Sequence, residues 1–479
     1  MRVRVWALPF FLASVSGCAI GPQYVRPEVP VPGTWRDAPV GQMTAPRESL
    51  DQWWTRFRDP MLDGLIERAV AGNQDLQIAA ARVREARAAR GIAAAAALPQ
   101  VDATADYTRT RRSESVSPFK ETAEVNSPFG PRDQSLFETG FDAGWELDVF
   151  GGVRRDKEAA LAQVQATQET QRDVLVTLLA DVARTYVELR GAQRRLAILD
   201  ETLRSEQDTL GLVKARAEAG LATQLDVARA EGLVATTTSE RPVVIRQAGE
   251  AVHRLGLLVG EGPDALAEVL AAPATIPFSP RELPAALPSE LLSRRPDVRR
   301  AERELAAATA RIGVARADLF PRFAILGSFG RSSDEPGDLP ALRSQFWSFI
   351  PGVRWPILSG GRIRANIRLQ TARQQQAQKT YEKTIVTAQQ EVADALLAHN
   401  RELDRQAALR TALAANRRAL DVSLERYTGG IESFLSVLDA QRSVYAAEDA
   451  LAQSERTLAV SLIAVYKSLG GGWSPYSGS

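Results

Sequence analysis

The spacing of apolar residues changes twice within the first half of the chain. Residues 60–98 are rich in Ala, Arg and Glu and predict a helix, with Asp59 placed to cap it and Pro60 at its first position. Beyond this helix, apolar and polar residues alternate over about 100–109 and more clearly over about 136–149. Side chains of a strand point alternately to its two faces, so each run predicts a β-strand.

The alternation returns in the second half, over about 322–330 and 345–357. Such a run is the weak signature of an outer-membrane β-barrel strand, although a half-buried sheet in a soluble domain gives the same pattern. One aromatic face, two matched hairpins and the N-terminal signal described below favour the barrel. The positions expected to face its lumen are Asp102, Asp106, Asp142, Glu146 and Asp148. Those expected to face lipid are Phe137, Phe141, Trp145 and Trp355.

After each strand pair the period becomes helical over an unusual length. No proline interrupts residues 154–217, and 64 residues at 1.5 Å each make a rod of roughly 95 Å. Alternate steps of three and four from Leu161 meet apolar residues at 13 of 17 positions, the repeat of a coiled coil. The exceptions include Glu206. The long helices are expected within 154–258 and 362–469, as hairpins that turn at glycines.

The chain contains two copies of one unit. The matched residues, separated by 222 or 210 positions, are Asp75 and Asp297, Pro99 and Pro321, Trp145 and Trp355, Gly220 and Gly430, and Leu225 and Leu435. We therefore expect one copy over 59–260 and a second over 288–470, joined by a proline-rich connector over 261–287. Each copy consists of a helix, a β-hairpin and a long helical hairpin. Residues 471–479 are expected to be a flexible tail.

The N-terminus has the pattern of a bacterial lipoprotein signal. Two arginines precede an apolar run, and small residues precede Cys18, the only cysteine of the 479 residues. An ordinary signal peptide with a chance cysteine is the alternative. We expect residues 1–17 to be removed, Cys18 to carry palmitate or a similar acyl chain, and 18–58 to form an extended arm from the lipid anchor. Ala19 favours the outer membrane over retention at the inner one.

Composition narrows the chemistry further. One cysteine and two isolated histidines, His253 and His399, exclude a Cys/His zinc site and a disulfide framework. We expect no metal, no cofactor and no enzymatic activity, since neither a nucleophile elbow nor a His-based dyad is present. The 59 basic and 58 acidic residues do not suggest a nucleic-acid partner. No stretch approaches the ~20 apolar residues of a membrane helix, so a membrane crossing would require strands.

Four strands per chain have a consequence for assembly. An open sheet edge in hydrocarbon would leave N–H and C=O groups without partners, so copies of the chain must pool their strands. Two copies would give eight strands and a nearly filled interior, whereas three would give twelve. A conduit favours the trimer. The fold class expected is thus an α+β membrane protein, a 12-stranded β-barrel continued by a coiled-coil α-barrel.

Several short motifs follow one another in order along the chain: Cys18 to Pro27, Trp53-Trp54, Phe57, Asp59-Pro60, Leu62, Asn73, Asp75-Leu76, Leu287 to Leu292, Arg294 to Asp297, Ile312-Gly313, Phe320-Pro321 and Leu438 to Arg442. In these residues the chain resembles the TolC-like outer-membrane efflux factors, in particular the lipoprotein branch of resistance-nodulation-division efflux systems. The resemblance implies a homotrimer in the outer membrane with a long periplasmic extension. It also implies a periplasmic adaptor and an inner-membrane pump as partners.

The expected function is that of a passive exit duct for small molecules, including antibiotics. A protein-secretion channel is the alternative, and a structural coiled-coil lipoprotein is a weaker one. In the family, the positions of Leu435, Asp439 and Arg442 form the periplasmic constriction, so these residues are the expected gate. A solvated Asp/Arg pair would show the same spacing. The turns at Gly220 and Gly430 are expected to contact the adaptor, although simple helix capping also explains them.

Overall fold

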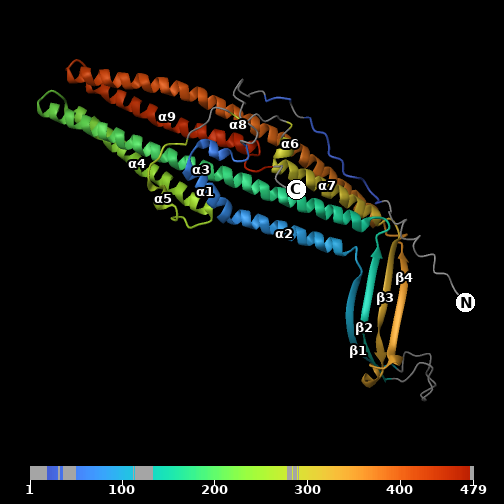
Figure 1. Cartoon of the computed structure of the whole chain (residues 1–479). Coiled ribbons are helices and arrows are strands. Elements are labelled where there is room, and N and C mark those ends of the chain that lie inside the picture. The colour runs from blue at the N-terminus through green and yellow to red at the C-terminus, as the bar shows by residue number, and fades with distance from the viewer. Residues whose placement is uncertain are drawn as a thin grey trace. The chain divides into compact units, whose positions relative to one another are not determined.

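The computed structural model describes residues 19–30, 33–35, 50–111, 113, 133–277, 283, 289 and 291–474. Cys18, the expected signal peptide and residues 475–479 of the expected tail lie outside these residues. The expectation that the flexible tail starts at 471 is wrong, because Trp473 is buried and the N–H of Gly472 donates to the carbonyl of Leu50 at 2.8 Å. In chain order the elements are η2 (Trp53–Phe57), α1 (Pro60–Gly72), α2 (Gln74–Ala95), β1 (Gln100–Arg111), β2 (Asp133–Leu147), α3 (Gly152–Glu218), α4 (Gln224–Val259), α5 (Ala267–Ala271), α6 (Leu291–Arg294), α7 (Pro296–Ala317), β3 (Arg322–Ser333), η4 (Pro336–Asp338), η5 (Leu342–Ser344), β4 (Gln345–Arg354), α8 (Arg362–Thr428) and α9 (Phe434–Ser468) (Figure 1).

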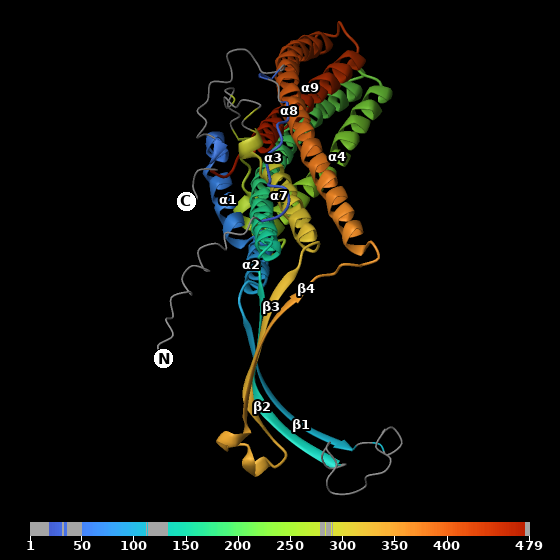
Figure 2. The ribbon, with the colours of Figure 1, turned by 90° about the vertical axis from the view of Figure 1, so that its right-hand side faces the viewer.

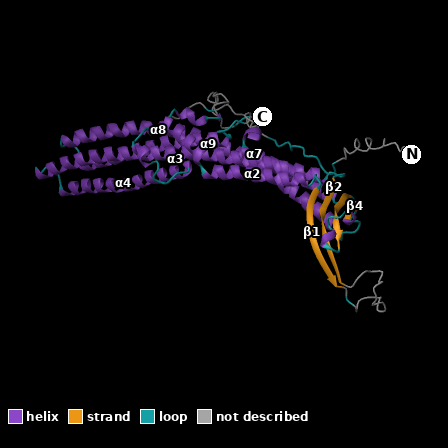
Figure 3. Cartoon of the chain, turned by 60° about the horizontal axis from the view of Figure 1, so that its bottom comes forward, coloured by secondary structure: helices purple, strands orange, loops and turns teal. Residues whose placement is uncertain are grey.

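The chain divides into two compact units. Unit 1 comprises residues 1–26, 84–165 and 302–379, and unit 2 comprises residues 27–83, 166–301 and 380–479. The four strands all belong to unit 1 (Figure 3, orange). Both copies of the repeat therefore contribute to both units. Within the described residues, no helix is long and apolar enough to cross a membrane.

The sheet of unit 1 is a four-stranded antiparallel meander in the order β1-β2-β3-β4 (Figure 2). β2 of the first copy pairs with β3 of the second, so the sheet joins the two copies. β1 and β4 are its edges. The predicted alternation is confirmed, and directly paired residues share a face: Asp102 pairs with Asp142, and Phe141 pairs with Phe329.

Two strands end earlier than their hydrophobic pattern predicted. β2 stops at Leu147 and β4 at Arg354. The expectation that Asp148 is a strand residue facing a lumen is wrong, because this carboxylate accepts bonds from the first turn of α3. Its oxygens receive the backbone N–H groups of Val153 at 3.0 Å and Arg154 at 2.8 Å. The first N–H groups of a helix have no partners within the helix, and they bind a carboxylate favourably. The alternation pattern of a strand contains no information about this contact.

A tryptophan marks the end of each hairpin in unit 1. The indole of Trp145 donates to the carbonyl of Ala97 at 3.1 Å, and that of Trp355 donates to the carbonyl of Leu319 at 3.0 Å. Ala97 and Leu319 each follow the helix that precedes the first strand of their copy. The duplicated sequence thus repeats a tertiary contact.

The described start of the N-terminal arm binds to unit 1. The backbone N–H of Ile20 donates to the carbonyl of Phe150 at 3.2 Å, and the Tyr24 hydroxyl donates to Glu302 at 3.1 Å. The Arg155 guanidinium, which is buried, bonds to the carbonyls of Ile20 and Gly21. The residues directly after Cys18 are therefore held beside the start of α3.

A capped helix follows the N-terminal arm in unit 2. The arm is not extended over all of 18–58 as expected, because its last residues form the helix η2, in which Trp53 and Phe57 are buried. Asp59 accepts the backbone N–H groups of Met61 and Leu62, and Pro60 is the first residue of α1, as predicted. The expectation of one helix over 60–98 is wrong, because the extended backbone of Asn73 ends α1 before α2 begins. The other carboxylate oxygen of Asp59 accepts the Tyr186 hydroxyl of α3 at 2.8 Å. Trp53 stacks on Tyr466 of α9 with ring centroids 5.3 Å apart, which ties the start of unit 2 to the helix that ends it.

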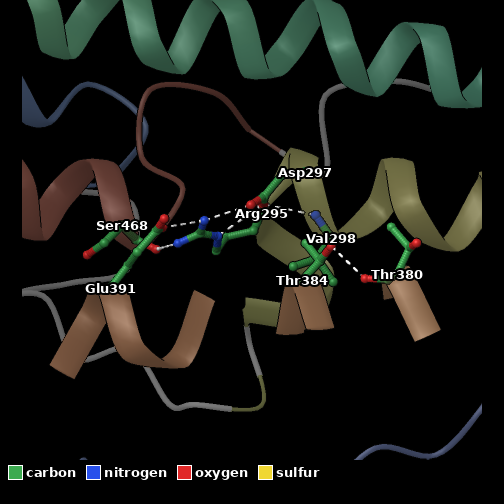
Figure 4. A network of polar contacts seen from close by, with 7 residues as sticks. All are labelled: Arg295, Asp297, Val298, Thr380, Thr384, Glu391 and Ser468. Carbon is green, nitrogen blue, oxygen red and sulfur yellow. Dashed lines mark hydrogen bonds and ion pairs between the residues drawn. The ribbon is translucent and has the colours of Figure 1, made fainter. Parts of the chain in front are cut away.

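The Arg294 to Asp297 motif forms a polar junction in unit 2 (Figure 4). Arg295 donates to both oxygens of Asp297, to Glu391 of α8 at 2.6 Å and to the carbonyl of Ser468, at the end of α9, at 3.0 Å. Burial lowers the pKa of Arg295, but the two carboxylates outweigh it and raise the pKa overall. A planar guanidinium can hold three chain segments at once, which gives this motif a structural role.

Candidate functional site

The two helical hairpins of unit 2 end in two separate turns of the same type. The N–H of Leu221 donates to the carbonyl of Arg216 at 2.7 Å, and the N–H of Ile431 donates to that of Arg426 at 2.9 Å. This six-residue closure requires a left-handed residue, and Gly220 (φ 73°) and Gly430 (φ 71°) supply it. The prediction that the long helical hairpins turn at glycines is confirmed.

Each turn presents apolar side chains outward. Leu221 is 67% exposed and Ile431 72% exposed, and one turn later Leu225 and Leu435 are 57% and 44% exposed. The two copies therefore carry matched pairs, which differ by 210 positions. Exposed apolar side chains that gather at one place indicate an interaction surface more often than a solvated one. We call Leu221, Leu225, Ile431 and Leu435 the tip leucine set, although one of the four is an isoleucine.

A buried cluster lies behind the tips. It joins Val213, Ala230 and Leu233 of the first hairpin to Tyr427, Phe434, Val437 and Leu438 of the second. The two hairpins therefore pack against each other within unit 2 instead of standing apart. The N-caps differ: Thr223 and Asp226 form a capping box, whereas the Ser433 side chain accepts no capping bond.

The expected gate residues share one face of α9. Leu435, Asp439 and Arg442 are exposed, while Phe434, Leu438 and Gln441 of the neighbouring face are buried. No salt bridge within 4.0 Å joins Asp439 to Arg442 in the described chain, although both residues are described. Asp439 and Arg442 therefore do not neutralise each other within the chain.

Glu206 is a buried acid that sequence reasoning passed over. It is 3% exposed; one oxygen accepts the Thr237 hydroxyl of α4 at 3.1 Å, and the other is buried without a partner. Burial raises the pKa of Glu206, while the Thr237 hydrogen bond and the charge of Arg442 partly offset this rise. Its place as a charged exception in the coiled-coil seam was the signal in the sequence. Arg442 of the expected gate is thus electrostatically linked to α3.

A second contact that the sequence did not reveal lies beside the tips. The Arg216 guanidinium is 4.8 Å from the ring centroid of Tyr427 and donates to the carbonyl of Thr428 at 3.0 Å. The Tyr427 hydroxyl is buried without a partner, and burial raises its pKa. This contact ties the end of α3 to the end of α8.

The strand register places the acidic residues of β1 and β2 that we expect to face the lumen on one face of the sheet. Asp102, Asp142 and Ser328 share one face, and Thr104 donates to Asp142 at 3.4 Å. Asp106 pairs with Glu138, and Glu146 lies 3.8 Å from Arg322. The opposite face carries Phe137, Phe141 and Trp145, together with aromatic residues of β3 and β4. Trp355 lies beyond the end of β4.

The histidines do not form a metal site. Across the described residues, no group of three or more His, Cys, Asp and Glu side chains could hold a metal ion. His399 is buried between α8 and α9, where its Nδ1 lies 3.1 Å from the Ser461 hydroxyl. Burial lowers the pKa of His399 to about 4, so it is a neutral packing residue at physiological pH.

Comparison with known proteins gives the family. The model of the outer membrane efflux protein family matches residues 65–261 and 287–471. Outer membrane protein OprJ of Pseudomonas aeruginosa is 36% identical over 461 residues, which cover 96% of this chain and 94% of OprJ. Solvent efflux pump outer membrane protein SrpC of Pseudomonas putida is 34% identical over 478 residues, 98% of each chain.

A solved structure agrees with the sequence comparisons. The outer-membrane channel OprN aligns with a TM-score of 0.87 at 34% identity, over 95% of this chain and 100% of OprN. The resemblance inferred from the motifs is therefore confirmed, and the names of these relatives favour efflux over protein secretion. Two long family matches and near-complete coverage of its relatives show that this chain belongs to the outer membrane efflux protein family.

Proposed function

We propose that three copies of this chain form the exit duct of a tripartite efflux pump, with the strands of unit 1 closed into a twelve-stranded barrel. The observation that carries the proposal is the open sheet β1–β4, which has one face that is acidic over β1 and β2, an opposite aromatic face and, among the described residues, two unpaired edges. Such a sheet is stable in a bilayer only when the edge β4 pairs with the edge β1 of another copy.

The faces of the sheet define the path of the solute. Asp102, Asp106, Asp142 and Glu146 would line the lumen, because polar side chains cost little there. The aromatic face would contact lipid, where a charge at the bilayer midplane costs about 2–4 kcal/mol. The duct would be passive, and antibiotics and other small molecules would pass through it.

Cysteine labelling tests the barrel. Asp142→Cys and Phe141→Cys are neighbours on β2 and serve as controls for each other. A membrane-impermeant maleimide should label the first in the assembled protein and spare the second. Equal labelling of both, or a mass in detergent equal to one chain instead of three, would contradict the proposal.

The partners proposed are a periplasmic adaptor and, through it, an inner-membrane pump. Leu221, Leu225 and Ile431 of the tip leucine set, together with the turns at Gly220 and Gly430, offer the adaptor two similar apolar surfaces. Photo-crosslinkers at Ala222 and Glu432 should capture a periplasmic protein in intact cells. A crosslinker at Arg410, an exposed residue of α8 away from the turn, is the control and should capture none. Equal capture at all three would reject docking at the tips.

The gate proposed is formed by Leu435, Asp439 and Arg442 near the symmetry axis of the trimer. Their shared exposed face on α9 supports it, since the protomer itself does not cover them. The first copy has Arg229 and Gly232 where the second has Asp439 and Arg442, so only one hairpin carries this charge pattern. Charged rings in channels are a recurrent selectivity device.

The anchor proposed is an acyl chain on Cys18. The next residues, Ala19 and Ile20, are held beside Phe150 and Gly151, at the point where β2 leads into α3. An acyl chain on the preceding residue would then start next to the end of the sheet. This position matches the membrane boundary that the proposed barrel requires.

A further inference from the structure

Basic residues are concentrated in the helical part of unit 1. Its four helical segments, 84–95, 152–165, 302–317 and 362–379, contain 14 Arg and Lys against 5 Asp and Glu, a net charge of +9. The whole chain has a net charge of only +1. The excess is therefore local, and it lies in the unit that contains the strands.

The start of α8 contributes most of this excess. No Asp or Glu occurs between Asp338 and Glu382, and the exposed arginines in that interval are Arg343, Arg354, Arg362, Arg364, Arg368 and Arg373. Arg343 pairs with Asp338. Among the described residues, the other five side chains have no carboxylate within 4.0 Å. Five unpaired arginines in twenty residues are a strong local positive field.

In the first copy of the repeat, an acidic side chain neutralises the arginine at the equivalent turn. Gly151 (φ 79°) and Gly361 (φ 82°) occupy equivalent turns, 210 residues apart. In the first copy Asp148 caps α3 and pairs with Arg154 at 3.3 Å. The second copy keeps the arginine as Arg364 but has Leu358 in place of the acid.

The next turn differs in another way, because both members of its ion pair have changed. Glu158 of α3 pairs with Arg155 at 2.7 Å, and their equivalents in α8 are Arg368 and Ala365. Over the matched residues 148–165 and 358–375, the first copy has three basic and three acidic residues, whereas the second has four arginines and no acid. Local folding does not require this charge, because the first copy folds the same turn with the acids present.

Apolar residues are exposed beside these arginines. Trp355, Ile357 and Leu358 are 57%, 84% and 94% exposed. Trp355 bonds to the carbonyl of Leu319 at the end of the sheet, which is where an aromatic girdle lies in membrane barrels. Apolar and aromatic side chains next to unpaired arginines match the two parts of a phospholipid, its acyl region and its phosphate.

We propose that this β4–α8 junction binds an anionic phospholipid of the adjoining bilayer leaflet. Arg362, Arg364 and Arg368 contact the headgroup phosphate, and Trp355, Ile357 and Leu358 insert beside its acyl chains. The inference rests on the proposed membrane insertion of the sheet. A second copy of the chain does not neutralise the junction: in the proposed barrel its β1 pairs with β4, and its α2, which leads into that strand, has three arginines and one acid over 84–95. It would add positive charge.

The test uses full-length protein in nanodiscs of phosphatidylcholine with or without phosphatidylglycerol. Native mass spectrometry counts the phosphatidylglycerol that the released protein retains. Arg364→Gln with Arg368→Gln should weaken retention about 25-fold, since each arginine near an anionic surface gives about a fivefold gain. Arg410→Gln with Arg418→Gln removes the same charge from exposed positions of α8 in unit 2 and should retain lipid as the parent does.

A second variant guards against loss of folding. Leu358→Asp restores the acid of the first copy, should cap α8, and should lower retention without lowering the unfolding temperature. Equal retention by the parent and both arginine variants would overturn the proposal. So would a Leu358→Cys side chain that a bilayer-confined maleimide cannot reach, because a second copy would then cover the junction. Protein that fails to insert into any bilayer would reject the proposed duct as well, whereas insertion without lipid preference rejects this inference alone.

Discussion

Two leucines of α9, one exposed and one buried, allow the proposed gate to be tested separately from the core. Leu435 is 44% exposed, whereas Leu438, three residues later, is 3% exposed and lies in the buried cluster behind the tips. The same substitution by alanine should therefore have different effects at the two positions. A buried Leu→Ala change typically costs about 2–5 kcal/mol of unfolding free energy, whereas a surface change stays within about 0.5 kcal/mol.

Leu438→Ala should lower the stability of the tip without opening a specific path. Hydrogen exchange of the α9 amides near the tip should accelerate by at least tenfold, because each ~1.4 kcal/mol lost from local stability is a factor of ten. Leu435→Ala should leave those exchange rates close to the parent's. If three Leu435 side chains form the proposed constriction, this variant should raise single-channel conductance in planar bilayers.

The two outcomes can be told apart. Leu435→Ala with parental conductance would show that the constriction lies elsewhere. Accelerated exchange in Leu435→Ala, comparable to that of Leu438→Ala, would show that Leu435 is a packing residue in the assembled protein. Either result would refute the division of α9 into a gating face and a core face.

Three further outcomes follow from the same contacts. Burial raises the pKa of Glu206 above 4.5, so the folded protein binds this proton more tightly than the unfolded chain does, and that advantage is present below about pH 4.5 and is lost as the pH rises. Glu206→Gln should therefore raise the unfolding temperature at pH 7, by a margin that shrinks as the pH falls through the raised pKa of the folded protein toward 4.5; a constant margin would exclude the buried charge as its cause. Asp439→Ala with Arg442→Ala should raise conductance and make cells leakier to large antibiotics at unchanged trimer yield, and unchanged conductance would identify a solvated surface pair. Cys18→Ser should abolish labelling by radioactive palmitate while trimers still form, since strand pairing and not the acyl chain holds them together; labelled Cys18→Ser protein would locate the acyl chain at another residue.

Periodicity determined the local structure of this chain with few errors. The switch between periods of two and about 3.6 gave the four strands, the long helices and the glycine turns, because each period follows from backbone geometry alone. Asp59 and Pro60 gave the start of α1, since capping is a local interaction between neighbouring residues. At Asp148 the alternation pattern predicted a strand residue, but its carboxylate bonds to the first turn of α3 and the strand ends before it.

Only the tertiary structure decided which segments meet. The pairing of β2 with β3 across the two copies, the packing of Tyr427 against the first hairpin and the burial of Glu206 join residues far apart in the sequence. Alternation says that a strand has two faces but not which strand lies beside it, and a seam position says that a side chain is buried but not what it bonds to. A period is a property of the backbone within one segment, whereas a partner is a property of the space between segments. That is why the sequence alone determined the elements and the family of this protein, and the fold alone determined the environment of its charges.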